Sequence, residues 1–456
     1  MKQSETKPSQ LIYEFADHYA EKATNGNTIN PALYTQYDVK RGLRHADGTG
    51  VLVGLTNIGN AHGYVVDEHE KTPSEGRLSY RGYSVGDLIT GYAQEKRFGF
   101  EEVCYLLLLG DLPTKKQLAE FTRVLGDNRT LPKNFTEDVI MKRPSSDIMN
   151  KLARSVLVSY SFDDYPDDIS IPNILRQGIR LLARVPAMAA YGYQALAHYF
   201  EGQSLYLHAP DPALSTAENF LRMIRSDGEY TRLEAELLDM ALILHAEHGG
   251  GNNSSFTVHV VASTDTDIYS VMAAAIGSLK GPKHGGANIR VREMVEEMKA
   301  TIDWRNKDAV QTYLTAVVEK RAYDKSGLIY GMGHAIYTLS DPRAVLLKNK
   351  ARELAEATDR MDNFNLYDMI EALAPSVLGA KKGRTAPICA NVDLYSGLVY
   401  DMLGIPPSLY TPIFAMSRMA GWCAHLLEER VSGGKIIRPA NKNLKPPATY
   451  TPLANR

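Results

Sequence analysis

Apolar residues recur at helical spacing along most of this chain. The run 100–108 places them at i, i+3, i+4, i+7 and i+8, and the segment 110–113, Gly-Asp-Leu-Pro, ends the pattern. Asp341 and Pro342 have the residue types of an N-cap and a first helical position, and an amphipathic run follows them. A further helical stripe consists of Leu237, Ala241, Leu244 and His248. These patterns predict a mainly helical, all-α protein.

Signals for strands are few and lie near the start of the chain. The best are 51–56, Val-Leu-Val-Gly-Leu-Thr, and 78–83, Leu-Ser-Tyr-Arg-Gly-Tyr. We therefore expect a minor β element before residue 90. The first 40 residues hold a short amphipathic helix around Ile12 and Phe15 and are expected to form an arm or an interface element, whereas the tail after Arg438 is expected at the surface.

Composition and charge exclude several classes of protein. The chain has 456 residues, enough for two or more domains, with 44% apolar and 23% charged residues. Its formal charge of −2 provides no basic surface for nucleic acid and no polybasic membrane patch. Any anion must therefore be bound by a few local basic residues.

Cysteine usage and hydropathy indicate a cytoplasmic protein. The three cysteines are widely spaced, which fits neither a disulfide framework nor a CxxC metal site. The polar N-terminal residues lack an apolar signal core. The longest apolar run, 103–109, is far shorter than the roughly 20 residues of a membrane helix, so we expect no membrane span.

Three histidines are flanked by glycines. They are His248 in His-Gly-Gly-Gly-Asn, His284 in Lys-His-Gly-Gly-Ala-Asn and His334 in Gly-Met-Gly-His-Ala. Because glycine has no side chain, the pattern indicates imidazoles around a small buried substrate. His248 would equally suit a helix C-terminus, where it interacts with the helix dipole, and the alternative for His284 is a histidine in a turn. His245 and His248 have a spacing that could bind zinc, but no carboxylate or thiol completes a ligand set nearby.

Three charged residues are candidates for binding or catalysis. Arg418 is the only Asp, Glu, Lys or Arg in 411–427, and its guanidinium requires an anion, either a structural carboxylate or a substrate. Arg343 lies in the first turn of the helix that Asp341 caps, where it favours an anion or forms a surface salt bridge. Asp393 is either an N-cap or a carboxylate in an apolar pocket, with a raised pKa, that acts as a base.

Taken together, these stretches resemble the citrate synthase family. The resemblance runs from about residue 40 to about residue 440. Several ordered motifs with compatible spacing make a chance match very improbable. The motifs that carry the resemblance are 78–88, 248–252, 279–288, 331–335, 341–343, 391–393, 396–397 and 417–418.

The resemblance implies an all-α, two-domain fold that works as a homodimer. Residues 1–40 would form an N-terminal extension, 41–288 and 398–456 the two parts of a large domain, and 289–397 a small domain. The active site would lie in the cleft between the domains, which closes on oxaloacetate and excludes water from the reaction. No metal and no redox cofactor are implied, since the CoA thioester is a substrate.

The resemblance also assigns roles to individual residues. Asp393 resembles the base that takes a proton from the methyl group of acetyl-CoA. His284 resembles the residue that hydrogen-bonds the thioester oxygen as the enol forms, and His334 the group that polarises the oxaloacetate carbonyl. Positions that hold oxaloacetate or citrate are matched by His248, Arg343 and Arg418. Arg438 matches an arginine that reaches the partner subunit's site. Citryl-CoA would form and then be hydrolysed to citrate and CoA.

The binding site for the CoA phosphates departs from the family pattern. Many bacterial members carry Arg-Val-Tyr-Lys after the histidine that corresponds to His334, whereas this chain has Ala-Ile-Tyr-Thr at 335–338. The missing cations would have held CoA phosphates. Lys381, Lys382 and Arg384 are candidate replacements, and a solvated loop is the alternative interpretation of these three residues.

Rival functions remain open. A 2-methylcitrate synthase uses propionyl-CoA on the same scaffold, and one methylene changes binding by only about 1–3 kcal/mol, so either or both acyl groups are possible. A non-catalytic dicarboxylate sensor would be expected to lack Asp393 or His284, and both are present. A helical scaffold whose histidines bind zinc would contain stoichiometric metal and would unfold with a chelator.

Overall fold

The computed structural model describes residues 10–46, 48–67, 70–382 and 387–456. It contains two compact units, Met1–Leu55 and Thr56–Arg456. The first unit contains α1 (Gln10–Asn27), α2 (Ala32–Gln36) and a short 3-10 helix, η1 (Arg41–Leu43). The amphipathic helix predicted in the first 40 residues is confirmed as α1, whose side chains of Ile12, Phe15 and Tyr19 are exposed.

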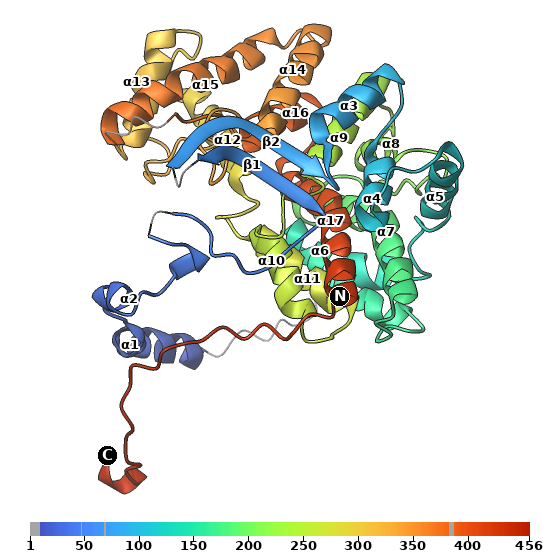
Figure 1. Ribbon diagram of the computed structural model, residues 1–456. Helices are drawn as coiled ribbons and strands as arrows, with labels where there is room; N and C mark the ends of the chain where they lie inside the picture. The colour runs from blue at the N-terminus through green and yellow to red at the C-terminus, as the bar shows by residue number, and fades with distance from the viewer. Residues whose placement is uncertain (1–9, 47, 68–69, 383–386) are drawn as a thin grey trace. The chain divides into compact units, whose positions relative to one another are not determined.

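The second unit is mainly helical, which confirms the predicted all-α fold (Figure 1). Its first part contains α3 (Val85–Gln94), α4 (Phe100–Leu109), α5 (Lys115–Asp127), η2 (Thr136–Met141), α6 (Ile148–Val158), η3 (Ser159–Phe162), α7 (Ile171–Glu201), α8 (Thr216–Ile224), α9 (Arg232–His245), α10 (Asn253–Ala262) and α11 (Ile268–Lys280). It continues with α12 (Ala287–Thr301), α13 (Lys307–Val318), α14 (Pro342–Ala357), α15 (Met361–Lys382), α16 (Val392–Met402), η4 (Pro407–Leu409), α17 (Tyr410–Ser432) and η5 (Leu453–Asn455). Among the described residues, no helix is long and apolar enough to cross a membrane.

A small antiparallel sheet provides the minor β element. Its strands are β1 (Gly59–Asp67), β2 (Glu70–Tyr80) and β3 (Tyr83–Ser84), in that order across the sheet. The strand predicted at 78–83 is therefore confirmed in β2 and β3. The strand predicted at 51–56 is wrong, because this segment pairs with no strand in the part of the chain that the structure describes.

Helix α17 is the central helix of the second unit. It packs against α4, α7, α9, α10 and α11, and its residues from Tyr410 to Leu427 are all buried. This enclosure explains why its sequence is apolar on every face. Where α17 passes the segment that follows α9, Gly421 allows a close approach, because a Cβ there would lie 2.5 Å from the Ala246 carbonyl oxygen.

Helices α12 to α16 form a second group, visible in yellow to orange in Figure 1. The β1–β2 hairpin packs against the chain just before α14, where Gly76 donates its backbone N–H to Ser340 Oγ at 3.2 Å. Gly63 is required at this contact, since a Cβ there would lie 2.5 Å from the Ile336 carbonyl oxygen. The hairpin therefore supports the segment that follows His334.

Helix α9 ends earlier than the apolar stripe indicates. The stripe places His248 on the helix, but α9 ends at His245. The Tyr80 hydroxyl donates to the carbonyl of Ile243 at 2.8 Å and replaces the backbone donor that a continued helix would supply. The prediction that His248 ends this helix is therefore wrong, and His248 lies in the connection to α10.

The close packing at Gly421 gives a test of the core. Gly421→Ala should lower the free energy of unfolding by about 1–3 kcal/mol, because the added methyl group must displace both the backbone at Ala246 and the Glu247 side chain. Chemical denaturation followed by circular dichroism measures this change.

Gly277→Ala is the matched control, since Gly277 is an exposed position in α11 and an added Cβ would have no neighbour within 4 Å. Alanine is favoured over glycine inside a helix by about 1 kcal/mol, so this variant should be at least as stable as the parent. An equal loss of stability in both variants would contradict the packing described here.

Candidate active site

The loop that carries His334 is fixed to the start of α16. Gly333 donates its backbone N–H to the Cys389 carbonyl at 2.8 Å, and the Asn391 side chain donates to the Gly333 carbonyl at 2.8 Å. Gly331 has a φ of +84°, and a Cβ there would lie 2.9 Å from the Leu394 side chain. The glycines beside His334 therefore serve the approach of the loop to α16 and not only the approach of a ligand.

His334 presents one ring nitrogen as a hydrogen-bond donor. Its Nδ1 accepts the backbone N–H groups of Ile336 at 3.0 Å and Tyr337 at 3.3 Å, and its ring stacks on the Tyr337 ring. Burial and the nearby Arg343 guanidinium lower the pKa of His334 to about 4, against the opposing effect of Asp341. The ring is therefore neutral near pH 7, with its proton on Nε2.

Arg343 and Asp341 form a buried ion pair. The Asp341 carboxylate accepts from Arg343 Nε at 3.0 Å and from a terminal guanidinium nitrogen at 2.8 Å. It also caps α14 by accepting the backbone N–H of Arg343, as predicted, and it accepts the backbone N–H of Val392 at 3.2 Å. The alternative of a surface salt bridge at Arg343 is therefore wrong, because Arg343 is only 3% exposed.

Asp393 lies in the first turn of α16 and does not cap this helix. Asn391 is the N-cap, since its side-chain oxygen accepts the Asp393 backbone N–H at 3.0 Å. Among the described residues, none donates a hydrogen bond to the Asp393 carboxylate. Burial raises the pKa of Asp393 to about 6, with Arg343 opposing this shift and Asp341 adding to it. The structure thus excludes the N-cap interpretation of Asp393.

Arg418 is fully buried with most of its guanidinium unpaired. Its Nε donates to the His245 carbonyl at 2.6 Å, and its guanidinium lies over the Phe414 ring. Both terminal nitrogens lack a hydrogen-bond partner among the residues that the structure describes. Burial lowers the pKa of Arg418 to about 10, against the attraction of the Glu247 carboxylate. Arg418 is therefore charged near pH 7 and can still bind an anion.

The ring of His248 contacts two aromatic rings of the segment between α13 and α14. Its ring lies 5.2 Å from the His334 ring and 5.6 Å from the Tyr337 ring, centroid to centroid, and its Nε2 has no partner among the described residues. Burial, followed by the charge of Arg343, holds its pKa well below the ordinary value. Arg418 and His284 also contribute to this shift, so the predicted residues converge on one region.

The ring of His284 is held by Ser254, which in turn is held by Trp422. Its Nε2 lies 3.1 Å from Ser254 Oγ, and Trp422 Nε1–H donates to the same oxygen at 3.1 Å. The turn after α11 needs Gly285, because a Cβ there would lie 2.5 Å from the Leu279 carbonyl oxygen. Burial, followed by the charge of Arg418, lowers the pKa of His284 to about 4.

Other predicted residues do not join this cluster in the structure. Arg438 lies between α17 and η5, in a stretch without regular structure, and the tail that follows it is exposed, as predicted. Lys381 and Lys382 end α15, but their side chains and the whole of Arg384 lie outside the described residues. The candidate CoA-phosphate site of these three residues therefore stays a prediction.

Three residues that contact or support the candidate histidines belong to no sequence motif that would have identified them. Tyr337 stacks on His334, Ser254 holds His284, and Trp422 donates to Ser254. Tyr337 lies three residues from a candidate histidine, which is the only local hint. The partners of His284 come from α10 and α17, so no short motif connects them.

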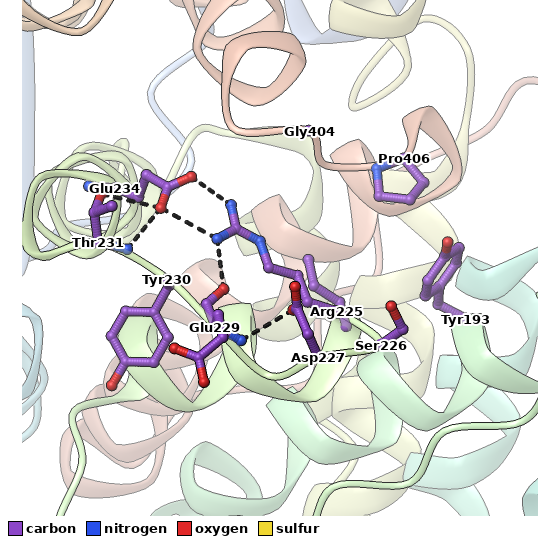
Figure 2. Close-up of a pocket in the computed structure, with 11 residues that line it drawn as sticks. Tyr193, Arg225, Ser226, Asp227, Glu229, Tyr230, Thr231, Glu234, Gly404 and Pro406 are labelled. Carbon is purple, nitrogen blue, oxygen red and sulfur yellow. Dashed lines mark hydrogen bonds and ion pairs between the residues drawn. The ribbon is translucent and has the colours of Figure 1, made fainter. Parts of the chain in front are cut away.

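A surface cavity of about 580 Å³ lies elsewhere, around the connection between α8 and α9 (Figure 2). Arg225 is the basic residue in its lining, and its guanidinium is already bound to Glu234 at 2.6 Å and to the Leu403 carbonyl at 2.8 Å. None of the predicted site residues lines this cavity. The cavity therefore has no unpaired cation for an anionic substrate.

The fold and the site define a mainly helical protein with a buried cationic centre and neutral imidazoles. The family model for the C-terminal domain of citrate synthase matches residues 48–440. Citrate synthase of Haloferax volcanii is 34% identical and covers 92% of this chain and 99% of its own. A 2-methylcitrate synthase of Shewanella oneidensis is 34% identical, with coverage of 83% and 92% respectively.

Solved structures agree with these relatives. Citrate synthase of Thermoplasma acidophilum, in a ternary complex with carboxymethyl coenzyme A and oxaloacetate, superposes with a TM-score of 0.74 at 25% identity. The match covers 91% of this chain and 99% of that one. The chain therefore belongs to the citrate synthase family and is an acyltransferase of the citrate synthase type.

The environment of His334 predicts its protonation state. A model histidine is half protonated near pH 6.5, whereas His334 should stay neutral, with its proton on Nε2, down to about pH 5. The ¹⁵N shifts of the ring, assigned by comparison with His334→Gln, distinguish the two tautomers and the cation. A titration midpoint near pH 6.5, or an Nδ1–H tautomer, would contradict the hydrogen bonds described above.

Proposed function

We propose that the chain condenses acetyl-CoA with oxaloacetate and water to give citrate and CoA. The reaction proceeds through an enol of the thioester and through citryl-CoA. The main support is the fully buried guanidinium of Arg418, whose two terminal nitrogens have no hydrogen-bond partner among the described residues and which lies beside neutral histidines. A dicarboxylate needs fixed guanidinium groups to replace its lost hydration. The Thermoplasma relative, whose structure contains oxaloacetate and carboxymethyl coenzyme A, supports the same substrates.

Oxaloacetate is held by Arg343, Arg418 and His248, and its reacting carbonyl is polarised by His334. The backbone bonds of the His334 ring are at Nδ1, and no described residue accepts a hydrogen bond from its Nε2–H. As the new carbon–carbon bond forms, the carbonyl oxygen gains negative charge. A donor already in place stabilises this charge without a reorganisation cost.

Asp393 takes a proton from the acetyl methyl group while His284 stabilises the enol oxygen. The raised pKa of about 6 suits a carboxylate that must be ionised near neutral pH and still be basic enough to accept this proton. The Ser254 hydroxyl donates to Asn252 Oδ1 at 2.8 Å, and when it turns to donate to His284 Nε2 at 3.1 Å the ring proton lies on Nδ1 and is available to the thioester oxygen. Hydrolysis of the citryl thioester by water then releases citrate and CoA.

The domain arrangement follows from the same proposal. Residues 289–397 form a small domain with His334, Arg343 and Asp393, whereas 41–288 and 398–456 form a large domain. The cleft between them closes on oxaloacetate and excludes water from the enol. Residues 1–40 form an N-terminal extension.

The proposal also includes the oligomeric state of the enzyme and the residues that bind the CoA phosphates. The enzyme is a cytoplasmic homodimer in which Arg438 reaches the partner subunit's site. Lys381, Lys382 and Arg384 hold the CoA phosphates. The condensation itself uses no resident cofactor and involves no nucleic acid or membrane.

A second acyl substrate is supported by the Shewanella relative, whose name is 2-methylcitrate synthase and which is as similar in identity as the Haloferax enzyme. Propionyl-CoA differs from acetyl-CoA by one methylene group. Such a difference changes transition-state binding by only about 1–3 kcal/mol, so turnover of both thioesters on one scaffold is physically reasonable.

Release of free thiol tests the function directly. Purified protein receives acetyl-CoA or propionyl-CoA with and without oxaloacetate, and the released CoA is followed colorimetrically. We expect release that depends on oxaloacetate, and the ratio of the two kcat/KM values identifies the preferred acyl group. Binding of oxaloacetate without any thiol release would instead support a dicarboxylate sensor.

Arg418→Met removes the guanidinium while keeping a long apolar side chain. Loss of charge-assisted hydrogen bonds, worth about 1.5–3 kcal/mol each, should raise the KM for oxaloacetate at least tenfold. The KM for the acyl-CoA serves as the internal control and should change much less. An unaltered KM for oxaloacetate would make Arg418 a structural residue.

The raised pKa of Asp393 predicts a pH profile. Because the base must be ionised, kcat/KM should rise with pH through about 6, and at about pH 5 it should be about tenfold below its plateau. Asp393→Asn should lose about 10²–10⁴ of the activity. Asp401→Asn, at the other end of α16, is the control and should retain the parent profile. A flat profile from pH 5 to pH 7 in the parent enzyme would overturn the assignment of Asp393.

A further inference from the structure

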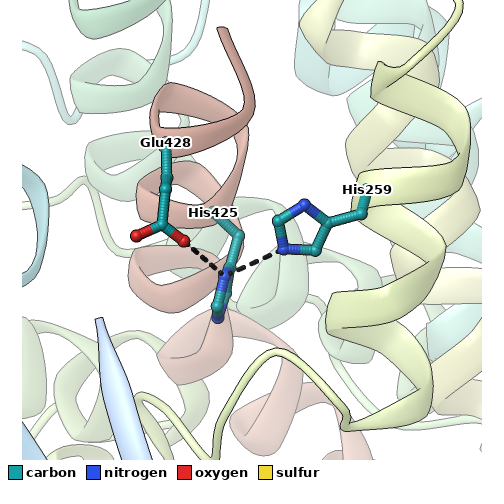
Figure 3. A group of neighbouring side chains, drawn as sticks. All are labelled: His259, His425 and Glu428. Atoms are coloured by element: carbon teal, nitrogen blue, oxygen red, sulfur yellow. Dashed lines mark hydrogen bonds and ion pairs between the residues drawn. The ribbon is translucent and has the colours of Figure 1, made fainter. Parts of the chain in front are cut away.

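A second cluster of titratable side chains lies next to the loop that carries His248. His259 of α10 faces His425 of α17, and Glu428 follows one turn later on α17 (Figure 3). His259 Nε2 and His425 Nδ1 are 3.2 Å apart, and Glu428 Oε2 is 3.8 Å from His425 Nδ1. These three atoms all lie within 4.8 Å of one another. The proposed condensation uses none of these residues.

The outer nitrogen of each ring is held by a carboxylate. His259 Nδ1 lies 2.7 Å from Glu429 Oε2, and His425 Nε2 lies 3.1 Å from Glu247 Oε1. Because a carboxylate only accepts, each outer nitrogen carries the ring proton of a neutral histidine. Both inner nitrogens then direct lone pairs toward each other. Two lone pairs at 3.2 Å repel, so a cation, either a shared proton or a metal ion, belongs between them.

Glu428 distinguishes these two possibilities. Its Oε1 accepts the backbone N–H of Asn57 at 2.7 Å, but its Oε2 is buried without a hydrogen-bond partner among the described residues. A proton shared by the two rings would leave this oxygen unsatisfied, at a cost of about 1–3 kcal/mol or more for a charged group. A metal ion would use both inner nitrogens and this oxygen at once.

We propose that His259, His425 and Glu428 bind a divalent metal ion of the zinc type. Two nitrogens at about 2.0–2.1 Å from a tetrahedral zinc ion lie about 3.3 Å apart, close to the observed 3.2 Å. Glu429 and Glu247 then act as the outer carboxylates that orient metal-binding histidines. Two histidines and one glutamate form a known type of zinc ligand set, with water at the fourth position.

Charge and space at the cluster also suit such an ion. Three carboxylates, Glu247, Glu428 and Glu429, surround the two imidazoles. Arg81 and Arg418 offset part of the charge of Glu247 and Glu428, and a dication would offset the rest. Gly250 covers the cluster, since a Cβ there would lie 3.5 Å from His425 Cε1 and 3.7 Å from His259 Nε2. The ion would therefore connect α10 to α17 and support the glycine loop that follows His248.

Zinc binding by tag-free protein tests this proposal, which does not depend on the proposed function. Protein stripped with a chelator is dialysed against low-micromolar Zn²⁺, and bound metal is measured by mass spectrometry. We expect one ion per chain and a thermal midpoint that rises with Zn²⁺. No bound zinc and no change in the midpoint would mean that the two rings share a proton, which would overturn the proposal.

Variants distinguish zinc bound at this site from zinc bound by exposed histidines. Glu429→Gln changes only an outer partner and should weaken zinc binding roughly 10–100-fold, whereas His259→Gln should abolish it. His198→Gln, at an exposed histidine of α7, is the control and should bind zinc like the parent. Equal uptake by the parent and by Glu429→Gln would refute the site, and this comparison decides the matter even if His259→Gln fails to fold.

Discussion

The buried positive charge of Arg418 is the constraint on which the centre of this protein depends. Its helix is enclosed on all sides, and one backbone carbonyl is its only hydrogen-bond partner among the described residues. The nearby Glu247 carboxylate offsets part of the desolvation cost without pairing directly with the guanidinium. Burial keeps His248, His284 and His334 neutral; the charge of Arg418 adds to this effect at His248 and His284, and that of Arg343 at His248 and His334. The centre can therefore bind an anion while its imidazoles still act as neutral hydrogen-bond donors.

Asp341 fixes the geometry of the second group of side chains and contributes to their proton affinity, which burial dominates. One carboxylate caps α14, pairs with Arg343 and accepts a backbone N–H at the start of α16. Asp393 follows directly in α16, so its position relative to Arg343 is fixed by the same interactions. The balance of burial, Arg343 and Asp341 then leaves Asp393 with a pKa near neutrality. The interactions that fix the position of Asp393 therefore also influence its pKa.

The hydrogen bonds between the His334 loop and the start of α16 have a consequence for motion. They make His334, Arg343 and Asp393 one connected element, so a displacement of α12 to α16 would carry all three together. His248, His284 and Arg418 belong to the other group of helices. The two groups meet at the contact of the His248 and His334 rings, and also where α14 packs against α9 and α12 against α17. Closure of the proposed cleft would change distances between these two sets but not within either of them.

The sequence by itself determined those features that depend only on residues close together in the chain. The Asp341 cap, the end of α4 at Gly110, the amphipathic α1 and the anomalous Arg418 in an apolar helix all follow from neighbours within a turn or two. The motifs also identified the residues that converge. Only tertiary structure decided that α9 stops at His245, because the terminating hydroxyl of Tyr80 lies 163 residues away from Ile243. It also decided which cations are paired, which imidazoles are neutral and that His259 meets His425. Desolvation and hydrogen-bond partners depend on groups that are distant along the chain, and no local pattern encodes them.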